Sequence, residues 1–429
     1  MIAQLSVLVG VMLLLMGLGV PVFLAMAGAA IGYAIAFWPA MPPQVIVQTF
    51  VQGLDNIAFT AIPYFFVIGT IMNAGGMSQR LLRLARSVTG PLRGGLSHAN
   101  VAANVVFAGV SGSAVADAAA VGSIMIPAMK RDGYDAAYAA AVTAAAATIG
   151  PIIPPSIPMV IFGLFTGASV SALFLGGVVP GLLMGAFLLV TTWVIARRRG
   201  YPAGQWQGLG EVWAAFKASF LALLLPVLVI GGLISGIATT SEIGALAAVY
   251  AALVTVGVYR EIDLVGLWHA CAEAAADSAR VLIVIAVVGA FVWIVASIGV
   301  GPSLAASLKA MNLGPTAIVG LIAVGLIIAG TLIESIILLV VIVPILVPAA
   351  LAAGADLIHL GVVVVLACCI GLIIPPAGIL IYLTAAQAEA QVTRVVRELV
   401  PFTIALLLLL ALIIVYPPLV TWLPSAVGK

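Results

Sequence analysis

The chain has 429 residues, of which 64% are hydrophobic and 7% are charged, and its formal net charge at pH 7 is +2. Soluble domains carry about 25% charged residues, so this composition excludes a large water-soluble domain. Apolar runs of about 20 residues recur along the sequence, and they predict an all-α polytopic membrane protein. We expect membrane lipids around such a chain, and no nucleic-acid partner.

The sequence lacks one nucleotide-hydrolysis motif and also lacks the cysteine spacing of a disulfide framework or metal site. No GxxxxGK[ST] phosphate loop occurs, so the chain does not hydrolyse ATP by that route. The three cysteines, Cys271, Cys368 and Cys369, show neither disulfide nor metal-ligand spacing. They are predicted to be packing residues.

The first elements expected along the chain are N-terminal scaffold helices and an interfacial helix within residues 1–56. A third span is predicted next, and after it Arg80, Arg83 and Arg86 repeat every three residues among leucines. That spacing is typical of an amphipathic helix whose basic face lies on the lipid surface, and it favours this interpretation over a ligand site. The predicted spans cover residues 5–19, 22–37 and 57–74, and the interfacial helix covers residues 45–54.

A stretch of small and polar residues interrupts the next apolar run, which extends over residues 96–129. A straight helix of that length would reach about 50 Å, well beyond the hydrocarbon core. We therefore predict a re-entrant helical hairpin with its tip near Ser111, Gly112 and Ser113. Irregular backbone at membrane depth is tolerated only where protein covers it or where it lines a cavity, so this tip is the first candidate binding site. Asp117 follows the tip, and an intramembrane carboxylate is functional by default.

Prolines interrupt the next predicted span, which starts near Ala136. Residues 150–158 read Gly-Pro-Ile-Ile-Pro-Pro-Ser-Ile-Pro. Prolines at this density cannot continue a helix, because each lacks the backbone donor and clashes with the preceding turn. The chain is therefore expected to unwind in mid-membrane, which frees carbonyl groups on one side of the break and amide groups on the other.

The Pro-Pro break occurs twice. The Gly-Pro-Ile-Ile-Pro-Pro segment that starts at Gly150 is echoed by Gly-Leu-Ile-Ile-Pro-Pro from Gly371, a shift of 371 − 150 = 221 positions. One ungapped shift predicts an internal structural repeat, with a second hairpin over residues 316–350 and a second break over residues 371–378. The same shift pairs Gly109 with Gly330, Pro127 with Pro348, Gly133 with Gly354, Asp135 with Asp356, and Pro180 with Pro401.

The basic residues indicate that the two repeats are inverted. Lys130 and Arg131, at the foot of the first hairpin, have uncharged counterparts after the shift, and the counterparts of Arg394 and Arg397 are also uncharged. Because Lys and Arg favour the cytoplasmic side, equivalent positions are expected on opposite sides of the membrane. The predicted organisation is a first repeat over 57–200, second scaffold helices and an interfacial arm over 201–280, and a second, inverted repeat over 281–429.

Inverted repeats with helices broken at the midplane are typical of secondary transporters. Carbonyl groups at the broken ends suit a hard cation such as Na⁺, and helix N-terminal amides attract an anionic group. Neither tip and neither break contains Lys or Arg, so helix ends and cations would have to hold an anion there. The candidate substrate- and ion-binding residues are Ser111, Gly112, Ser113, Asp117, Gly150, Pro151, Pro154, Pro155, Ser156, Thr331, Glu334, Ser335, Gly371, Pro375, Pro376 and Gly378. We predict Na⁺ as coupling ion, no other cofactor and no catalytic residue.

The tip motif Gly-x-Ser-Gly-Ser-Ala-x-Ala-Asp-Ala from Gly109, together with the break from Gly150, resembles the large membrane subunit of tripartite ATP-independent periplasmic (TRAP) transporters, the DctM type. The resemblance covers nearly the whole chain. It implies a scaffold domain, a mobile elevator domain with two hairpins, and Na⁺-coupled uptake of an organic acid. It also implies a small four-helix membrane subunit, a periplasmic substrate-binding protein, and a place in the bacterial cytoplasmic membrane.

The resemblance also implies two Na⁺ sites. The first would use Ser111, Ser113, Gly150 and Pro154, and the second would use Thr331, Gly371 and Pro375. Ile374 and Ala377 stand where the family pattern has Thr and Val, which removes a hydroxyl ligand expected at the second site.

Two other interpretations remain open on the sequence. One is a stand-alone carrier of organic anions with the same inverted repeats and no binding protein. The other is an intramembrane serine protease, because residues 109–112 match a GxSG pattern. Such an enzyme needs a general base within reach of the serine, and none of His98, His269 and His359 has the expected setting, so we predict no enzyme activity.

Overall fold

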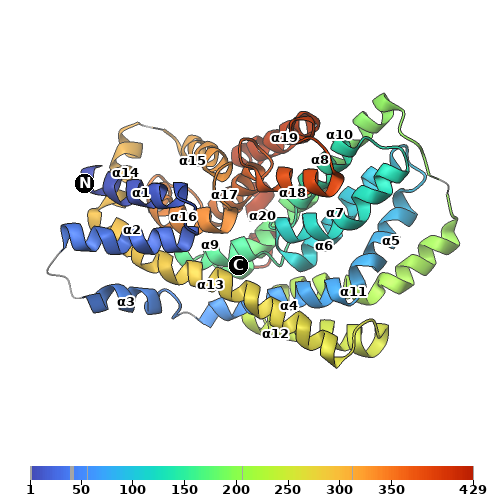
Figure 1. Cartoon of the computed structure of the whole chain (residues 1–429), viewed down its shortest axis with the longest axis horizontal. Coiled ribbons are helices and arrows are strands. Elements are labelled where there is room, and N and C mark those ends of the chain that lie inside the picture. Colours follow the sequence, from blue (N-terminus) through green and yellow to red (C-terminus); the bar gives the residue numbers. More distant parts are fainter. Residues whose placement is uncertain (1, 39–42, 56, 205, 312, 429) are drawn as a thin grey trace.

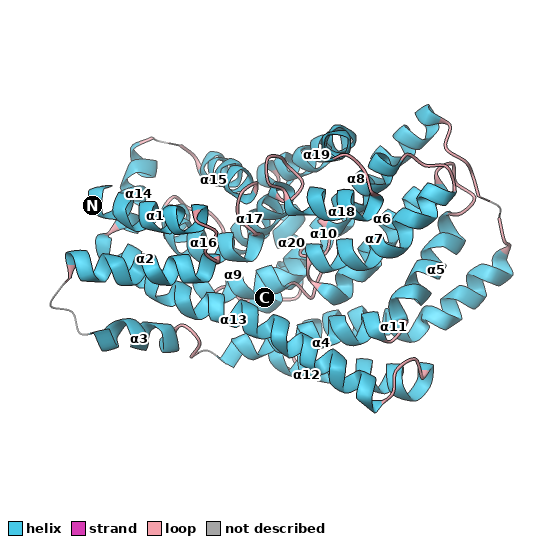
Figure 2. Ribbon diagram, in the orientation of Figure 1, coloured by secondary structure: helices cyan, strands magenta, loops and turns pink. Residues whose placement is uncertain are grey.

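The computed structural model describes residues 2–38, 43–55, 57–204, 206–311 and 313–428, and it consists of helices joined by short loops (Figures 1 and 2). Within these ranges the only β pairing is an isolated bridge between Arg93 and Ala203. Among the described residues, six helices are long and apolar enough to cross a membrane, or up to seven if a bent pair counts as one span. The predicted all-α polytopic fold is confirmed.

The first half of the chain begins with three helices, continues through a bent pair and a hairpin, and ends in a long helix. Its helices are α1 (Ile2–Gly17), α2 (Val22–Phe37), α3 (Pro43–Gln52), α4 (Ala61–Ala74), α5 (Met77–Thr89), α6 (Gly95–Ser111), α7 (Ala114–Arg131), α8 (Ala136–Ala147), α9 (Ile157–Thr166) and α10 (Val170–Arg199). A short 3₁₀ turn, Ile57–Thr60, precedes α4.

The second half follows the same order of elements. Its helices are α11 (Leu209–Ser235), α12 (Thr240–Ala252) with a π-helical continuation (Leu253–Tyr259), α13 (Leu264–Ile298), α14 (Val300–Ala310), α15 (Pro315–Gly330), α16 (Ser335–Ala352), α17 (Leu357–Gly371), α18 (Ile379–Ala388), α19 (Val392–Val415) and α20 (Pro418–Ala426).

Helix boundaries recur with the shift found in the sequence. The shift of 221 positions relates both the first and the last residues of α7 and α16, and it also relates the first residues of α3 and α13. The repeat therefore includes the N-terminal helices and starts earlier than residue 57. The same residue type caps equivalent helices: Asp135 accepts a hydrogen bond from Ala137 N at 2.9 Å to cap α8, and Asp356 accepts one from His359 N at 2.7 Å to cap α17.

The predicted boundary after residue 280 lies inside α13, which is continuous. Its counterpart in the first half is divided into α3 and α4. The sequence explains the difference, because Gly53 and Pro63 in the first half correspond to Ala274 and Val284 in the second. Glycine and proline disfavour a helix interior, whereas Ala274 and Val284 permit it.

The two halves pack together through two equivalent contacts, each between a hairpin of one half and the helix after the break of the other half. Hairpin one (α6 and α7) packs through α7 on α18 of the second half, and hairpin two (α15 and α16) packs through α16 on α9 of the first half. Figure 1 shows hairpin one to the right of the centre of the molecule and hairpin two to the left. The hairpins therefore approach the centre from opposite ends, as inverted repeats require.

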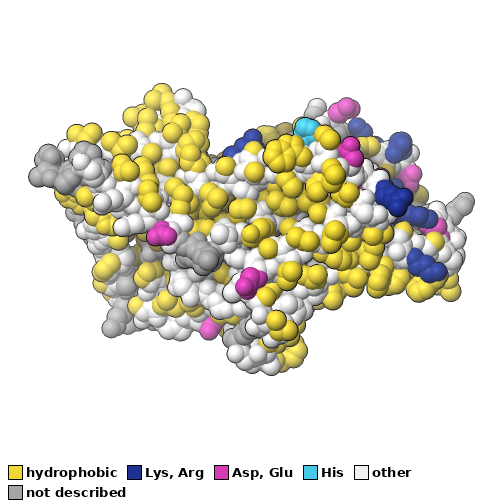
Figure 3. Space-filling view, turned by 90° about the horizontal axis from the view of Figure 1, so that it is seen from below, with side chains coloured by type: hydrophobic (Ala, Val, Ile, Leu, Met, Phe, Trp, Pro, Cys, Tyr) yellow, Lys and Arg dark blue, Asp and Glu magenta, His cyan; other side chains and the backbone are white. Residues whose placement is uncertain are grey.

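Basic side chains gather toward one end of the molecule, the right-hand end in Figure 3, and much of the remaining visible surface is apolar. Ion pairs join the two halves there: Arg394 lies 2.7 Å from Asp135, and Arg199 lies 2.8 Å from Glu398. Because Lys and Arg concentrate on the cytoplasmic side, we expect this end to face the cytoplasm.

The predicted amphipathic helix with the basic face is α5, which is bent by 69° from α4. Its arginines do not all face lipid. Arg80 lies 2.8 Å from Glu261, and Arg83 lies 2.8 Å from Glu211 on α11. The basic face is therefore attached to the second half of the chain, a contact that helical spacing does not disclose.

Candidate transport site

Tip one is the turn between α6 and α7. The helix α6 ends at Ser111, Gly112 has a left-handed φ of +61°, and the Ser113 hydroxyl caps α7 by accepting a hydrogen bond from Ala116 N at 3.4 Å. A Cβ on Gly112 would lie 2.5 Å from the carbonyl oxygen of Pro155, so tip one touches the first break backbone to backbone. Glycine meets both the conformational and the steric demand.

Asp117 is fully buried behind tip one. The Ser111 hydroxyl donates a hydrogen bond to its Oδ1 atom. The Oδ2 atom has no hydrogen-bond partner among the described residues, and it occupies the space into which a Cβ on Gly150 would project. A buried polar atom without a partner is costly, so Oδ2 is the strongest candidate cation ligand at tip one.

The first break separates α8 from α9, and residues 148–156 are all buried. The Ser156 hydroxyl donates a hydrogen bond to the carbonyl oxygen of Pro151 and accepts one from Met159 N at 3.2 Å. Ser156 is thus the N-cap of α9 and fastens the two sides of the break together. Both bonds are internal, so the hydroxyl has little capacity left for an ion.

Tip two is the turn between α15 and α16, and Glu334 caps α16. Its Oε2 atom accepts hydrogen bonds from Ile336 N at 2.9 Å and Ile337 N at 3.4 Å, while Oε1 accepts one from the Ser335 hydroxyl at 3.0 Å. Under the repeat shift, Glu334 holds the position that Ser113 holds in the first half. A carboxylate and a hydroxyl therefore do the same capping work at the two tips.

The second break separates α17 from α18 over residues 372–378, and it is less buried than the first because residues 375–377 are exposed. A Cβ on Gly371 would lie 2.8 Å from the backbone of Gly330, so tip two also touches its own break. The Thr331 hydroxyl donates a hydrogen bond at 2.8 Å back into the last turn of α15.

The two tips and the two breaks meet at one narrow cavity of about 20 Å³, enough for about one water molecule. The first turns of α7, α9 and α16 line it, and each such turn carries the positive end of a helix dipole. Five predicted residues contribute to the lining: Gly112, Ser113, Pro151, Glu334 and Ser335. The second break contributes Leu372.

The other predicted residues do not line the cavity. At the first tip and break these are Ser111, Asp117, Gly150, Pro154, Pro155 and Ser156; at the second they are Thr331, Gly371, Pro375, Pro376 and Gly378. Conversely, the cavity is lined by Phe66 of α4, which sequence reasoning missed. An aromatic residue inside an apolar helix carries no sequence signal that would set it apart.

Comparison with known proteins places the chain in a family. The sequence profile described as "Tripartite ATP-independent periplasmic transporter, DctM component" matches residues 9–419. The chain is 36% identical over 416 residues to the 2,3-diketo-L-gulonate TRAP transporter large permease protein of Escherichia coli, covering 97% of this chain and 98% of that protein. It is 35% identical over 378 residues to the sialic acid TRAP transporter large permease protein of Vibrio cholerae, covering 88% of each.

A relative from Pseudomonas aeruginosa, the C4-dicarboxylate TRAP transporter large permease protein, is 35% identical over 374 residues, which cover 87% of this chain and 88% of the relative. The crystal structure of the YdaH transporter of Alcanivorax borkumensis, described as having an unusual topology, has a similar fold. It matches with a TM-score of 0.67 and 16% identity over 89% of this chain and 90% of that chain.

These relatives are transporter permease subunits, so the protease interpretation is excluded. The Ser111 hydroxyl, which the protease interpretation would make a nucleophile, instead donates a hydrogen bond to Asp117. The chain belongs to the DctM component family of tripartite ATP-independent periplasmic transporters and is a multi-pass protein of the bacterial inner membrane.

Proposed function

We propose that this chain is the large permease subunit through which a Na⁺ gradient drives the import of an organic acid. The observation that carries the proposal is the convergence of two hairpin tips and two Pro-Pro breaks on one cavity. Secondary transporters built from repeats bind substrate and coupling ion at such broken helices. We further propose that both hairpins are re-entrant, so that their tips stop near the membrane midplane.

The proposed substrate carries a carboxylate. The names of the relatives include 2,3-diketo-L-gulonate, sialic acid and C4-dicarboxylate, which share that group. The positive ends of α7 and α9 and the hydroxyl of Ser113 would bind it, since no Lys or Arg is among the described residues that line the cavity. A cavity with room for about one water cannot hold such a molecule, so the tips must separate to admit it.

The first proposed Na⁺ site lies between tip one and the first break. Its carbonyl and hydroxyl ligands would come from Ser111, Ser113, Gly150 and Pro154. Asp117 supports this placement, because its Oδ2 atom is buried and has no hydrogen-bond partner among the described residues. Hard oxygen ligands of this kind suit Na⁺, and the ion would supply the missing partner.

The second proposed Na⁺ site lies between tip two and the second break, at Thr331, Gly371 and Pro375. Among the described residues of these two elements, no buried side-chain oxygen lacks a partner. Glu334 is already bonded to the first turn of α16. Backbone carbonyls would therefore be the main ligands, which makes the two sites similar in shape and different in chemistry.

We propose an elevator movement in which the residues of 95–199 and 315–426 move as one body against the remaining helices. The distribution of ion pairs supports this division. Three pairs lie within the proposed mobile body, for example Lys130 with Glu389 at 3.5 Å, and three lie outside it, for example Arg80 with Glu261 at 2.8 Å. None of the ion pairs formed by described residues crosses between the bodies, so sliding would break none of them.

Two protein partners complete the proposal. The family description names a tripartite, periplasmic transporter. We therefore propose that a small four-helix membrane subunit accompanies this chain and that a periplasmic binding protein delivers the substrate. A thermal-shift screen of that binding protein against organic acids would identify the substrate.

The test is uptake of that substrate into proteoliposomes that contain this chain and its small subunit, with the binding protein added outside. We expect accumulation under an inward Na⁺ gradient and none under an equal K⁺ gradient. Equal uptake with K⁺ would refute Na⁺ coupling. Full uptake without the binding protein would favour the stand-alone carrier over the tripartite system.

A further inference from the structure

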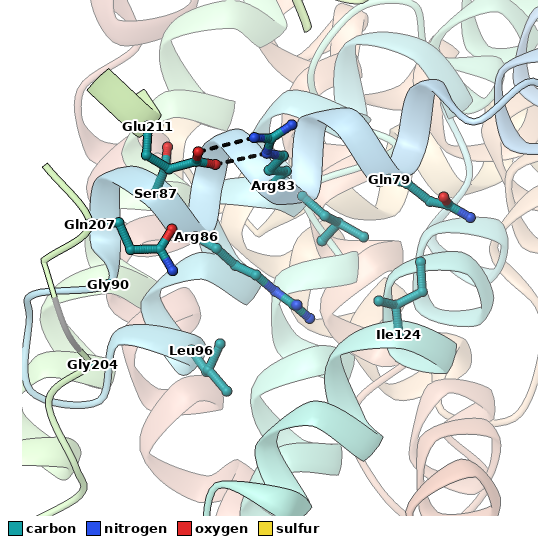
Figure 4. Close-up of a pocket in the computed structure, with 11 residues that line it drawn as sticks. Gln79, Arg83, Arg86, Ser87, Gly90, Leu96, Ile124, Gly204, Gln207 and Glu211 are labelled. Atoms are coloured by element: carbon teal, nitrogen blue, oxygen red, sulfur yellow. Dashed lines mark hydrogen bonds and ion pairs between the residues drawn. The ribbon is translucent and has the colours of Figure 1, made fainter. Parts of the chain in front are cut away.

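A larger cavity lies at the basic end of the molecule, away from the transport site. Its volume is about 630 Å³, and it is bounded by α5, the hairpin helices α6 and α7, and the segment before and at the start of α11 (Figure 4). Arg86 on α5, Leu96 on α6 and Ile124 on α7 face it from different elements. It therefore lies between the proposed mobile body and the helices outside that body.

One of the two arginines that line this cavity forms no ion pair among the described residues. The guanidinium of Arg83 donates hydrogen bonds of 2.8 and 3.0 Å to both carboxylate oxygens of Glu211, so these two charges cancel. Arg86 belongs to none of the ion pairs formed by described residues. Its Nη2 atom contacts the weak acceptor Sδ of Met125 at 3.3 Å, and its buried Nε has no hydrogen-bond partner among described residues.

An arginine in this state is stabilised by a hydrogen-bond acceptor that comes from outside the chain. Leaving a buried donor on a charged group without a partner is costly, and a bidentate anion removes that cost. Figure 4 shows the Arg86 side chain reaching across the cavity toward the hairpin, whereas Arg83 turns toward Glu211. The Arg86 side chain thus lines open space large enough for an anionic headgroup.

The surroundings place the cavity at the level of lipid headgroups. Trp206 and Trp213 are exposed beside the lining residues Gln207 and Glu211. Tryptophan concentrates at the membrane–water interface, where lipid phosphates lie. Val88, on the same helix as Arg86, is also exposed and adds an apolar contact for an acyl chain.

We propose that this cavity binds a phosphate group, that of an anionic phospholipid headgroup, with Arg86 as its counter-ion. Basic pockets between helices on the cytoplasmic side bind anionic lipid headgroups in this way. A bound lipid would connect α5 to the base of hairpin one, and this inference does not depend on the identity of the transported substrate. A free phosphate ion offers the same chemistry, so the experiment separates the two sources.

The test measures retention of phosphatidylglycerol by the full chain. Native mass spectrometry would count the phosphatidylglycerol and phosphatidylcholine molecules that remain bound after extraction from mixed vesicles. The variants are Arg86→Gln and, as a matched control, Arg198→Gln, which removes an exposed arginine outside the cavity. Gln207→Trp fills the cavity from an exposed loop and keeps Arg86, in case Arg86→Gln fails to fold. In parallel, the thermal shift produced by inorganic phosphate is measured on lipid-free protein.

We expect the original chain and Arg198→Gln to retain phosphatidylglycerol in preference to phosphatidylcholine, with about tenfold less retained by Arg86→Gln and by Gln207→Trp, equivalent to about 1.4 kcal/mol. A thermal shift with inorganic phosphate alone, lost in Arg86→Gln, would support the phosphate site and assign it to the free ion. Equal phosphatidylglycerol retention by all four proteins, with no phosphate-induced shift that depends on Arg86, would overturn the proposal.

Discussion

The unpaired Oδ2 atom of Asp117 occupies the space into which a Cβ on Gly150 would project. Tip one and the first break therefore meet at a buried carboxylate, with no side chain between them. The two residues are 33 positions apart in the chain (150 − 117); Asp117 lies on α7, and Gly150 lies in the turn that follows α8. Their contact makes the glycine a steric requirement of the proposed Na⁺ site.

Gly150→Ala is predicted to lower Na⁺-dependent uptake by about tenfold or more. The added methyl group must displace a buried carboxylate, and overpacking of this kind costs about 1–3 kcal/mol. Initial uptake rates in proteoliposomes would measure the effect. Gly325→Ala is the matched control, because a Cβ there meets open space in the interior of α15. Uptake by Gly150→Ala that matched the control would show that the close approach is unimportant.

Gly112→Ala is predicted to be more harmful than Gly133→Ala. Both glycines have positive φ angles, +61° and +82°, so alanine would cost about 1–2 kcal/mol of backbone strain at either position. Only Gly112 also faces another backbone, the carbonyl oxygen of Pro155 at 2.5 Å from an added Cβ, whereas Gly133 faces open space. Thermal unfolding in detergent and uptake rates would compare the two, and equal losses would contradict the proposed packing of tip one on the first break.

The repeat was predictable because glycine, proline and aspartate keep their positions wherever a turn or cap needs them. Gly133 and Gly354 both adopt positive φ, at +82° and +84°, just before the caps Asp135 and Asp356. These roles depend on the local backbone, so a single shift in the sequence reveals them. The full extent of the repeat was not predicted. The helices α3 and α13 begin at equivalent positions, but they share none of the glycine, proline and aspartate positions that reveal the rest of the repeat.

Glu334→Gln is predicted to transport nearly as well as the original chain, while Glu334→Ala loses about 1 kcal/mol of stability, the usual cost of an N-cap within a range of about 0.5–2 kcal/mol. Gln keeps an oxygen that accepts the hydrogen bond now made by Ile336 N at 2.9 Å. Uptake and thermal unfolding would be measured together. Loss of uptake in Glu334→Gln at an unchanged unfolding temperature would mean that the carboxylate binds ion or substrate and does more than cap α16.

Cross-linking of the two tips is predicted to stop transport. Ser113 and Ser335 line the same cavity although they come from opposite halves of the chain. In a chain with Cys271, Cys368 and Cys369 replaced, the Ser113→Cys and Ser335→Cys pair treated with a short bifunctional thiol reagent should form an internal cross-link and lose uptake. Each single cysteine is the control. Uptake that survived complete cross-linking would contradict the requirement that the tips separate.

The chemistry of the candidate site was less predictable than its location. A carboxylate in an apolar sequence has a high free-energy cost of burial, and only tertiary contacts determine which hydrogen-bond partners offset that cost. Glu334 is bonded by its own helix, whereas Asp117 keeps one oxygen without a partner. Likewise, Phe66 enters the lining from α4 through packing between distant elements, which no local pattern encodes.

The most direct test of Na⁺ coupling through tip one is the Na⁺ dependence of uptake by Asp117→Asn, compared with Asp356→Asn in the same proteoliposomes. Asn keeps an acceptor for the Ser111 hydroxyl and replaces the unpartnered Oδ2 atom with an amide NH₂ group that cannot ligate a cation, and at the Asp356 cap Asn is as good as Asp. We predict that Asp117→Asn needs at least about tenfold more Na⁺ for half-maximal uptake, equivalent to about 1.4 kcal/mol, while Asp356→Asn is unchanged. A Na⁺ dependence in Asp117→Asn equal to that of the original chain would contradict the account.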